Sequence, residues 1–225
     1  YAQARLGGES AAVVVVDCDT GDLRAIASAP SFDPNLFVRG ISVADYSLLT
    51  EDPYRPLANK TVQGTYPPGS TFKMVVSLAA LEEGLIGPED TVWCPGYLEV
   101  SGRRFHCWKR AGHGHVDLNT SLKQSCDVYY YDLAIKVGID KISAMANRMG
   151  LGVRHDLPMS AVASGLAPDR DWKARVRGQD WLVGDTVNVS IGQGFMLASP
   201  MQLAVMTARL ATGRSVTPRL VKSID

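Results

Sequence analysis

The sequence predicts an α+β fold in which helices pack on an antiparallel sheet. Strand-like segments lie near both ends of the chain, helical segments fill much of its middle, and no internal repeat or low-complexity tract interrupts it. With 225 residues, of which 46% are hydrophobic and 20% charged, the chain can bury a substantial core. We therefore expect one large domain or two small ones.

Charge and hydropathy exclude several partners. The 23 basic and 23 acidic residues cancel and form no block of like charge, so the sequence predicts no nucleic-acid partner. The longest strongly apolar run, residues 11–16, is far shorter than the roughly 18–20 residues that a membrane-spanning helix needs. If the protein is membrane-anchored, we expect the anchor to lie outside these residues.

The first predicted element is a β-hairpin. Residues 11–17 are rich in β-branched side chains, turn formers occupy 19–21, and residues 23–28 form a second mostly apolar run. Residues 29–66 carry several prolines and little periodicity, which predicts irregular structure.

A helix is predicted directly after this irregular segment. Residues 66–69 include two prolines and a glycine, whereas residues 70–83 repeat apolar side chains at three- and four-residue steps before Gly84. Ser70 is therefore predicted to open a helix. Further helices are predicted at 120–124, 128–137, 140–149 and 201–212, and an extended segment at 216–223.

Capping residues define the ends of two of these helices. Asp140 is predicted to cap the helix that Gly150 ends. Ser199 as N-cap, Pro200 at the first helical position and Gly213 after the last turn frame the helix over 201–212.

Ser70 and Lys73 form the first candidate catalytic pair. Residues three apart share a helix face, with Cβ atoms about 5–6 Å apart, so the two side-chain ends can meet. A serine hydroxyl needs a base to become a nucleophile, and a lysine can serve when burial or nearby positive charge favours its neutral form. The start of a helix supplies such positive potential. The alternative is a capping serine beside a solvated lysine.

A second hydroxyl and an acceptor come from Ser125-Cys126-Asp127, which interrupts the two middle helices. This segment is suited to relay a proton or to orient a substrate amide. The pattern is not specific, since Ser31-Phe32-Asp33 and Ser223-Ile224-Asp225 share it, and Asp127 alone could be a helix N-cap.

Together these segments resemble the motifs of the penicillin-binding protein family. Residues 66–73 resemble its first motif, residues 125–127 its second, and residues 192–194 followed by 199–202 the segment before its third. The fit is closest to class B members, some of which carry Asp rather than Asn at the end of the second motif. The resemblance implies the penicillin-binding and serine β-lactamase-like transpeptidase fold, with helices packed on an antiparallel sheet.

The resemblance also implies a function. Ser70 would attack the penultimate D-alanine carbonyl of a peptidoglycan stem peptide, and Lys73 would activate Ser70. Ser125 would be the proton shuttle towards the leaving group or the incoming amine, and Asp127 is the acceptor that completes the second motif. The expected activity is that of a DD-transpeptidase that β-lactam antibiotics acylate. A serine β-lactamase and a β-lactam sensor domain are alternatives of the same fold.

One family motif is missing from the sequence. Neither Lys-Thr-Gly nor Lys-Ser-Gly occurs, and the nearest string, Lys60-Thr61-Val62, lies in the wrong place. We therefore expect residues 1–225 to be a partial transpeptidase domain, without the last strands, the pedestal or a single-pass membrane anchor, and possible inactivity of this fragment follows. The resemblance places the parent protein at the periplasmic face of the bacterial inner membrane, with a glycosyltransferase of the cell-elongation machinery as partner.

Three cysteines and a histidine form a candidate metal site. Cys94, Cys107, His113 and Cys126 fall within 33 positions in glycine-rich or irregular surroundings, which fits a Cys₃His zinc site of structural role. Because Cys126 lies between Ser125 and Asp127, a metal there would hold the second motif in place. The alternatives are a disulfide between Cys94 and Cys107, or free thiols.

Other potential ligands rank below these four. His106 could replace His113, and His115 is a weaker candidate. Cys18 lies on the predicted hairpin and is expected to be a turn or strand residue.

Overall fold

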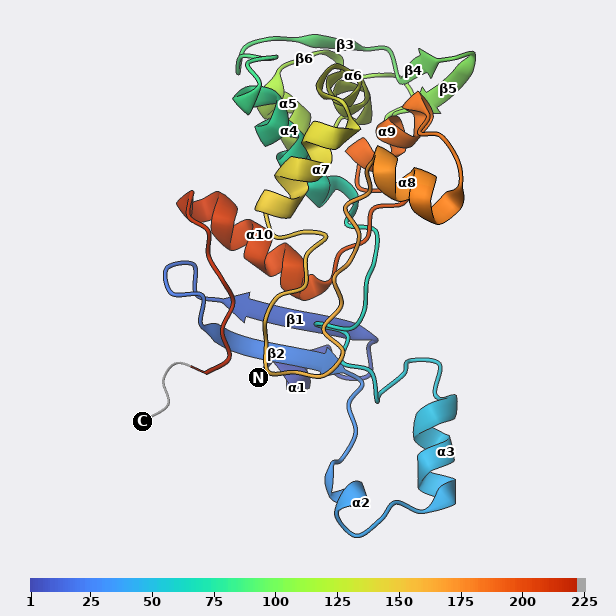
Figure 1. The fold of residues 1–225 in the computed structure, drawn as a ribbon, viewed down its shortest axis with the longest axis vertical. Coiled ribbons are helices and arrows are strands. Elements are labelled where there is room, and N and C mark those ends of the chain that lie inside the picture. The colour runs from blue at the N-terminus through green and yellow to red at the C-terminus, as the bar shows by residue number, and fades with distance from the viewer. Residues whose placement is uncertain (222–225) are drawn as a thin grey trace. The chain divides into compact units, whose positions relative to one another are not determined.

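The computed structural model describes residues 1–221, so the end of the predicted extended segment, residues 222–223, lies outside the described residues. The chain divides into two compact units (Figure 1). The first unit comprises Tyr1–Thr65, Arg154–Ser164 and the chain from Ala198, and the second comprises Tyr66–Val153 and Gly165–Leu197. The prediction of a single domain over 1–225 is not tested by this division.

The first unit is built on the predicted hairpin. Strand β1 (Ala11–Val16) pairs antiparallel with β2 (Leu23–Ala29), with Ala11 opposite Ala29 and a register shift at Val15/Val16. Figure 1 shows helix α10 (Pro200–Thr212) lying against this ribbon, and α1 (Ala2–Leu6) also contacts β2. A small core joins hairpin, helix and connecting loops; its members are Val62, Leu157, Val162 and Met201, with Val14, Leu23 and Ile26 against them.

The ends of α10 form as its sequence predicts. The Ser199 hydroxyl accepts from the Gln202 backbone N–H, the Gln202 side chain accepts from the Ser199 N–H, and Gly213 ends the helix in the left-handed conformation. This reciprocal pairing satisfies two otherwise orphan donors of the first turn. The prediction for this helix is confirmed.

Residues 29–66 are more helical than predicted. They contain α2 (Asn35–Val38) and α3 (Val43–Glu51), neither of which buries a residue. Helix α3 begins where Ser42 accepts from the Asp45 backbone N–H at 3.1 Å. Its apolar residues follow no helical stripe, so periodicity could not reveal it.

Helices dominate the second unit. Helix α4 (Lys73–Glu82) buries Val75, Val76, Ala79 and Ala80 and packs against α6 (Asp127–Val137) and α7 (Ile139–Arg148). The remaining helices are α5 (Leu118–Lys123), α8 (Arg170–Arg177) and α9 (Val183–Ser190), of which α9 also packs on α6.

Two short antiparallel pairs complete this unit: β3 (Val92–Cys94) with β6 (Gly114–Val116), and β4 (Tyr97–Val100) with β5 (Arg103–His106). The expected class of helices with antiparallel sheet is confirmed.

Two predicted helix starts were wrong. A 3₁₀ turn (Gly69–Phe72) precedes α4, so the α-helix begins at Lys73 and Ser70 lies in the turn before it. Helix α7 begins at Ile139 after Gly138, whose φ is 84°, so Asp140 lies within the first turn and is not the cap. At both helix starts a glycine adopts a positive φ, Gly69 before α4 and Gly138 before α7. The capping preferences used for the prediction do not describe a helix that begins after such a glycine.

No helix among the described residues combines the length and the apolarity that crossing a bilayer requires.

Candidate active site

A backbone contact positions the turn that carries Ser70. Gly69 adopts a φ of 59°, and its N–H donates to the carbonyl of Gly192 at 3.0 Å. A Cβ on Gly192 would lie 2.2 Å from the Gly69 carbonyl oxygen, so only glycine permits this approach. The Thr71 hydroxyl donates to the carbonyl of Pro68 at 2.8 Å and tightens the same turn.

Lys73 is buried with three acceptors around its ammonium group. Its side chain is 1% exposed, and Nζ donates to the Ser125 carbonyl at 2.9 Å, to Ser125 Oγ at 2.9 Å and to Asp127 Oδ1 at 2.7 Å. An ammonium has three N–H donors, so these acceptors satisfy it completely. The alternative of a solvated lysine is therefore wrong.

Ser125 lies between Ser70 and Lys73. Its hydroxyl donates to Ser70 Oγ at 2.9 Å while it accepts from Lys73 Nζ at 2.9 Å. The expected direct meeting of Ser70 and Lys73 is thus replaced by a bridge through Ser125. Ser125 adopts a φ of 51°, a left-handed conformation that serine rarely takes and that turns its hydroxyl toward Ser70.

Asp127 links this bridge to a second loop. Its other carboxylate oxygen, Oδ2, accepts from the backbone N–H of Trp108 at 2.9 Å. The indole Nε1 of Trp108 donates to the carbonyls of Gln124 and Ser125, each at 3.1 Å. Asp127 is the first residue of α6 and Cys126 is its N-cap residue, so the alternative of Asp127 as a simple N-cap is wrong.

Tyr130 contacts Lys73 and is not among the catalytic residues predicted from the sequence. Its ring centroid lies 5.5 Å from Lys73 Nζ, within the range of a cation–π interaction. Its buried hydroxyl lies 3.1 Å from Ser77 Oγ and 3.0 Å from Ser121 Oγ, and burial raises the pKa of this phenol. In the sequence Tyr130 is one of several aromatic residues that flank the candidate sites, and most aromatic residues belong to the core.

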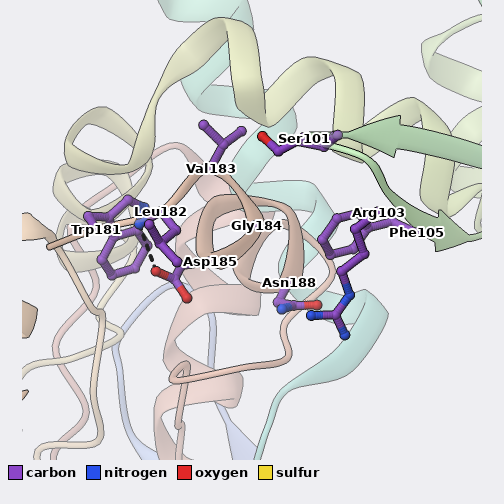
Figure 2. Close-up of a pocket in the computed structure, with 10 residues that line it drawn as sticks. Ser101, Arg103, Phe105, Trp181, Leu182, Val183, Gly184, Asp185 and Asn188 are labelled. Atoms are coloured by element: carbon purple, nitrogen blue, oxygen red, sulfur yellow. Dashed lines mark hydrogen bonds between the residues drawn. The ribbon is translucent and has the colours of Figure 1, made fainter. Parts of the chain in front are cut away.

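A pocket of about 430 Å³ lies between the β4–β5 hairpin and the start of α9 (Figure 2). Its apolar walls include Phe105, Leu182 and Val183, and its polar groups include Arg103 and Asn188. Sequence patterns gave no sign of it, because its two sides are about 80 residues apart in the chain.

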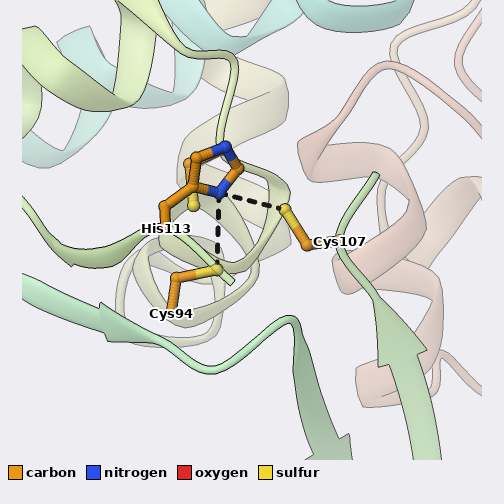
Figure 3. A group of neighbouring side chains, drawn as sticks. Cys94, Cys107 and His113 are labelled. Atoms are coloured by element: carbon orange, nitrogen blue, oxygen red, sulfur yellow. Dashed lines mark hydrogen bonds between the residues drawn. The ribbon is translucent and has the colours of Figure 1, made fainter. Parts of the chain in front are cut away.

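The structure brings the four proposed metal ligands together. Nδ1 of His113 lies 3.6 Å from Cys94 Sγ and 3.5 Å from Cys107 Sγ (Figure 3). With Cys126, the four potential ligand atoms all lie within 4.8 Å of one another, and the three cysteines are at most 1% exposed. No disulfide joins Cys94 to Cys107.

These distances fit a tetrahedral zinc ion. Zn–S bonds of about 2.3 Å and Zn–N bonds of about 2.0–2.1 Å place sulfur and nitrogen ligands about 3.5 Å apart. Burial lowers the pKa of His113 and so favours the neutral imidazole that binds metal. Burial raises the pKa of the Cys126 thiol, and a metal ion bound there would lower it by stabilising the thiolate.

The other potential ligands lie outside this cluster. His106 packs against the ring of Tyr97, and His115 packs against Trp93. Cys18 is exposed in the first unit.

Comparison with known proteins gives consistent matches. The family described as "Penicillin binding protein transpeptidase domain" matches residues 11–225. Among curated proteins, "Peptidoglycan D,D-transpeptidase MrdA" of Acinetobacter baumannii is 40% identical over 225 residues, covering 99% of this chain and 34% of the relative. The Escherichia coli K12 protein of that name is 42% identical over 206 residues, covering 91% of this chain and 32% of the relative.

Solved structures agree. Pseudomonas aeruginosa PBP2, in complex with WCK 5153, has a TM-score of 0.95 and 44% identity, covering 100% of this chain and 50% of that one. Helicobacter pylori PBP2, in complex with MreC, has a TM-score of 0.95 and 36% identity, covering 99% and 42%. The chain spans about a third of the length of the curated relatives it matches.

Proposed function

The chain belongs to the penicillin-binding protein transpeptidase domain family, and from that premise we propose that it carries the acylation machinery of a peptidoglycan DD-transpeptidase. Ser70 would attack the penultimate D-alanine carbonyl of a stem peptide. The bond to the terminal D-alanine would break, and an amine of a neighbouring strand would then take the acyl group from Ser70. β-Lactams would acylate the same oxygen.

The observation that carries this proposal is the continuous path from Ser70 through Ser125 to Lys73, with 2.9 Å at each step. Once Lys73 is neutral, both hydrogen bonds of this path would reverse, so that Ser70 donates its proton to Ser125 Oγ as Ser125 donates its own to Lys73 Nζ. The neutral lysine would form when one ammonium proton moves to Asp127 Oδ1, 2.7 Å away. Reversing the relay would deliver a proton to the leaving D-alanine amine.

The local electrostatics favour this chemistry. Ser70 precedes the first residue of α4, where the helix dipole contributes positive potential that stabilises developing negative charge on the attacked carbonyl oxygen. The 3₁₀ turn, the contact between Gly69 and Gly192 and the Thr71 hydroxyl bond to Pro68 hold the serine there.

A structural zinc ion is part of the proposal. Cys94, Cys107, His113 and Cys126 would hold it, and four protein ligands leave no open position for catalysis. Since Cys126 separates Ser125 from Asp127, and Cys107 precedes Trp108, the ion would fix both segments that surround Asp127. Its contribution would be positional: it would keep Ser125 within reach of Ser70.

The cellular location of the protein and its partner are also proposals. The relatives are named as peptidoglycan transpeptidases, and one solved relative is titled as part of a peptidoglycan synthase complex. We therefore place the parent protein at the periplasmic face of the bacterial inner membrane. Its expected partner is a glycosyltransferase of the cell-elongation machinery, which would supply the glycan strands.

The decisive experiment measures amine-dependent release of D-alanine from a stem pentapeptide by the full-length protein and by Ser70→Ala. We expect release that increases with an added acceptor amine and is lost in the variant. Rapid hydrolysis of penicillin without amine-dependent release would instead identify a β-lactamase. Stable acylation without any turnover would identify a sensor.

A further inference from the structure

A groove in the second unit takes no part in the proposed acyl transfer. It is lined by residues of β3, β4 and α6, and its volume of about 500 Å³ falls in the range of small-ligand sites. Its lining includes two aromatic residues, Trp93 and Tyr97, and two acidic residues, Glu99 and Asp132. None of its lining residues belongs to the catalytic residues or to the proposed metal ligands, so the groove is a separate site.

Trp93 offers an exposed aromatic surface on this groove. Trp93 is 59% exposed, whereas its strand neighbour Cys94 is 1% exposed, as expected for residues on opposite faces of β3. On the paired strand β6, the His115 ring centroid lies 5.0 Å from that of the indole, and a Cβ on Gly114 would lie 3.6 Å from the indole Cζ3. These contacts hold the indole against β6, so little side-chain entropy is lost when a ligand covers it.

The turn between β3 and β4 fixes the spacing of the two aromatic residues. The Gly96 carbonyl accepts from the Cys107 backbone N–H at 2.8 Å. Gly96 adopts a φ of 99°, and a Cβ there would lie 2.1 Å from the Arg110 carbonyl oxygen, so only glycine permits this approach. Trp93 and Tyr97 are four residues apart, which limits their Cα separation to about 14 Å. The groove is therefore a preformed surface with two aromatic residues within reach of one short oligomeric ligand.

The charged groups of the groove are already paired. Glu99 Oε2 lies 3.6 Å from Nε of Arg104, and Asp132 Oδ2 lies 2.7 Å from Nζ of Lys136. Each carboxylate therefore has a basic partner, and the groove offers little net charge to a charged ligand. A carboxylate has about four acceptor sites, so one ion pair leaves others for the hydroxyl or amide donors of a neutral ligand.

From this combination we infer that the groove binds the glycan strand of peptidoglycan, a polymer of N-acetylated amino sugars. The C–H face of a sugar ring packs on the indole of Trp93, and hydroxyl and amide groups of the sugar donate to Glu99 and Asp132. A proline-rich peptide would also pack on aromatic side chains, but prolines have no N–H to donate to these carboxylates. The inference rests on the proposed function, because the stem peptides that the transpeptidase would accept are attached to this strand.

Calorimetric titration with a soluble sugar tests this site. The probe is tetra-N-acetylchitotetraose, a peptide-free chain of N-acetylated amino sugars, and it is titrated into the full-length protein. The matched variants are Trp93→Ala, Trp93→Tyr and Tyr46→Ala. Tyr46 is 48% exposed on α3 and lies outside the groove. Penicillin acylation of each preparation reports separately on Ser70.

Wild type should bind the tetrasaccharide. Trp93→Ala should weaken binding by about tenfold or more, the usual effect of truncating an aromatic residue at the centre of a binding site. Trp93→Tyr keeps an aromatic face and should bind within about threefold of wild type, and Tyr46→Ala should leave the affinity unchanged. Rescue by tyrosine separates the loss of the aromatic surface from a general disturbance of β3.

Three outcomes overturn the inference. Wild type that reacts with penicillin but does not bind the tetrasaccharide has no glycan site, although the proposed function stands. Binding that Trp93→Ala leaves unchanged occurs elsewhere in the protein. Tighter binding of decaproline than of the tetrasaccharide identifies a peptide groove instead. If wild type binds the sugar through Trp93 but fails to react with penicillin, the proposed function fails and the groove remains a sugar site.

Discussion

Replacing Asp127 with alanine should destabilise the second unit far more than an ordinary ion-pair deletion. Lys73 is 1% exposed, and the carboxylate at 2.7 Å is its only charged partner among the described residues. Removing one member of a buried pair leaves the other charge uncompensated, at a cost of about 3–5 kcal/mol. In a domain of this size 1 kcal/mol shifts the melting temperature by about 2–4 °C, so Asp127→Ala should lower it by about 6–20 °C.

The matched control lies on the same helix. Asp132 pairs with Lys136 at 2.7 Å across one turn of α6, and both side chains are substantially exposed. Such pairs contribute about 0.3–0.5 kcal/mol, so Asp132→Ala should lower the melting temperature by about 1–2 °C. The assay is thermal unfolding of the 225-residue chain followed by circular dichroism. Equal shifts for the two variants would refute the reasoning that Lys73 is a buried cation dependent on Asp127.

Three other predictions concern proton transfer, metal and acid stability. Ser125→Ala should slow penicillin acylation of the full-length protein by about 10²–10⁴-fold. The control Ser31→Ala, in the same Ser-x-Asp pattern, should change the acylation rate less than twofold. A decrease of less than tenfold for Ser125→Ala would exclude the relay. Protein purified without chelator should contain one zinc per chain by elemental analysis and none after His113→Ala, whereas intact thiols with negligible metal in wild type would rule out the site. Asp117 caps α5 by accepting from the Thr120 N–H at 2.7 Å, which lowers its pKa in the folded state. The Asp117 cap therefore stabilises the fold above the ordinary pKa of 3.8, and this stabilisation is lost as the pH falls through the lower pKa of the folded state. Asp117→Asn should flatten the acid end of a curve of stability against pH, and an unchanged curve would contradict this.

The parts of the fold that were predictable from sequence depend on local signals. The β-branched runs of the hairpin and the capping box of α10 act within a few residues, and both formed as expected. Helix α3 lacks an apolar stripe, and α7 begins at a glycine whose conformation no capping rule describes. Composition and periodicity carry no information about either feature.

The sequence predicted which residues form the candidate site, but not which of them hydrogen-bond to one another. Spacing placed Ser70 and Lys73 on one face, yet Ser125 joins them across more than 50 residues through a left-handed backbone conformation. Residue spacing does not predict the contact between Tyr130 and Lys73 either, because that contact depends on how α6 packs on α4. Local sequence identifies the candidate reactive side chains, whereas tertiary packing decides which of them hydrogen-bond to one another.

The central claim is that Ser70 is the acylated nucleophile, and the intact mass of the full-length protein after incubation with benzylpenicillin tests it most directly. We expect a stable increase of one penicillin mass in wild type and in Ser31→Ala, and no increase in Ser70→Ala. An adduct that persists in Ser70→Ala, or no adduct and no loss of drug with folded wild type, would contradict the account.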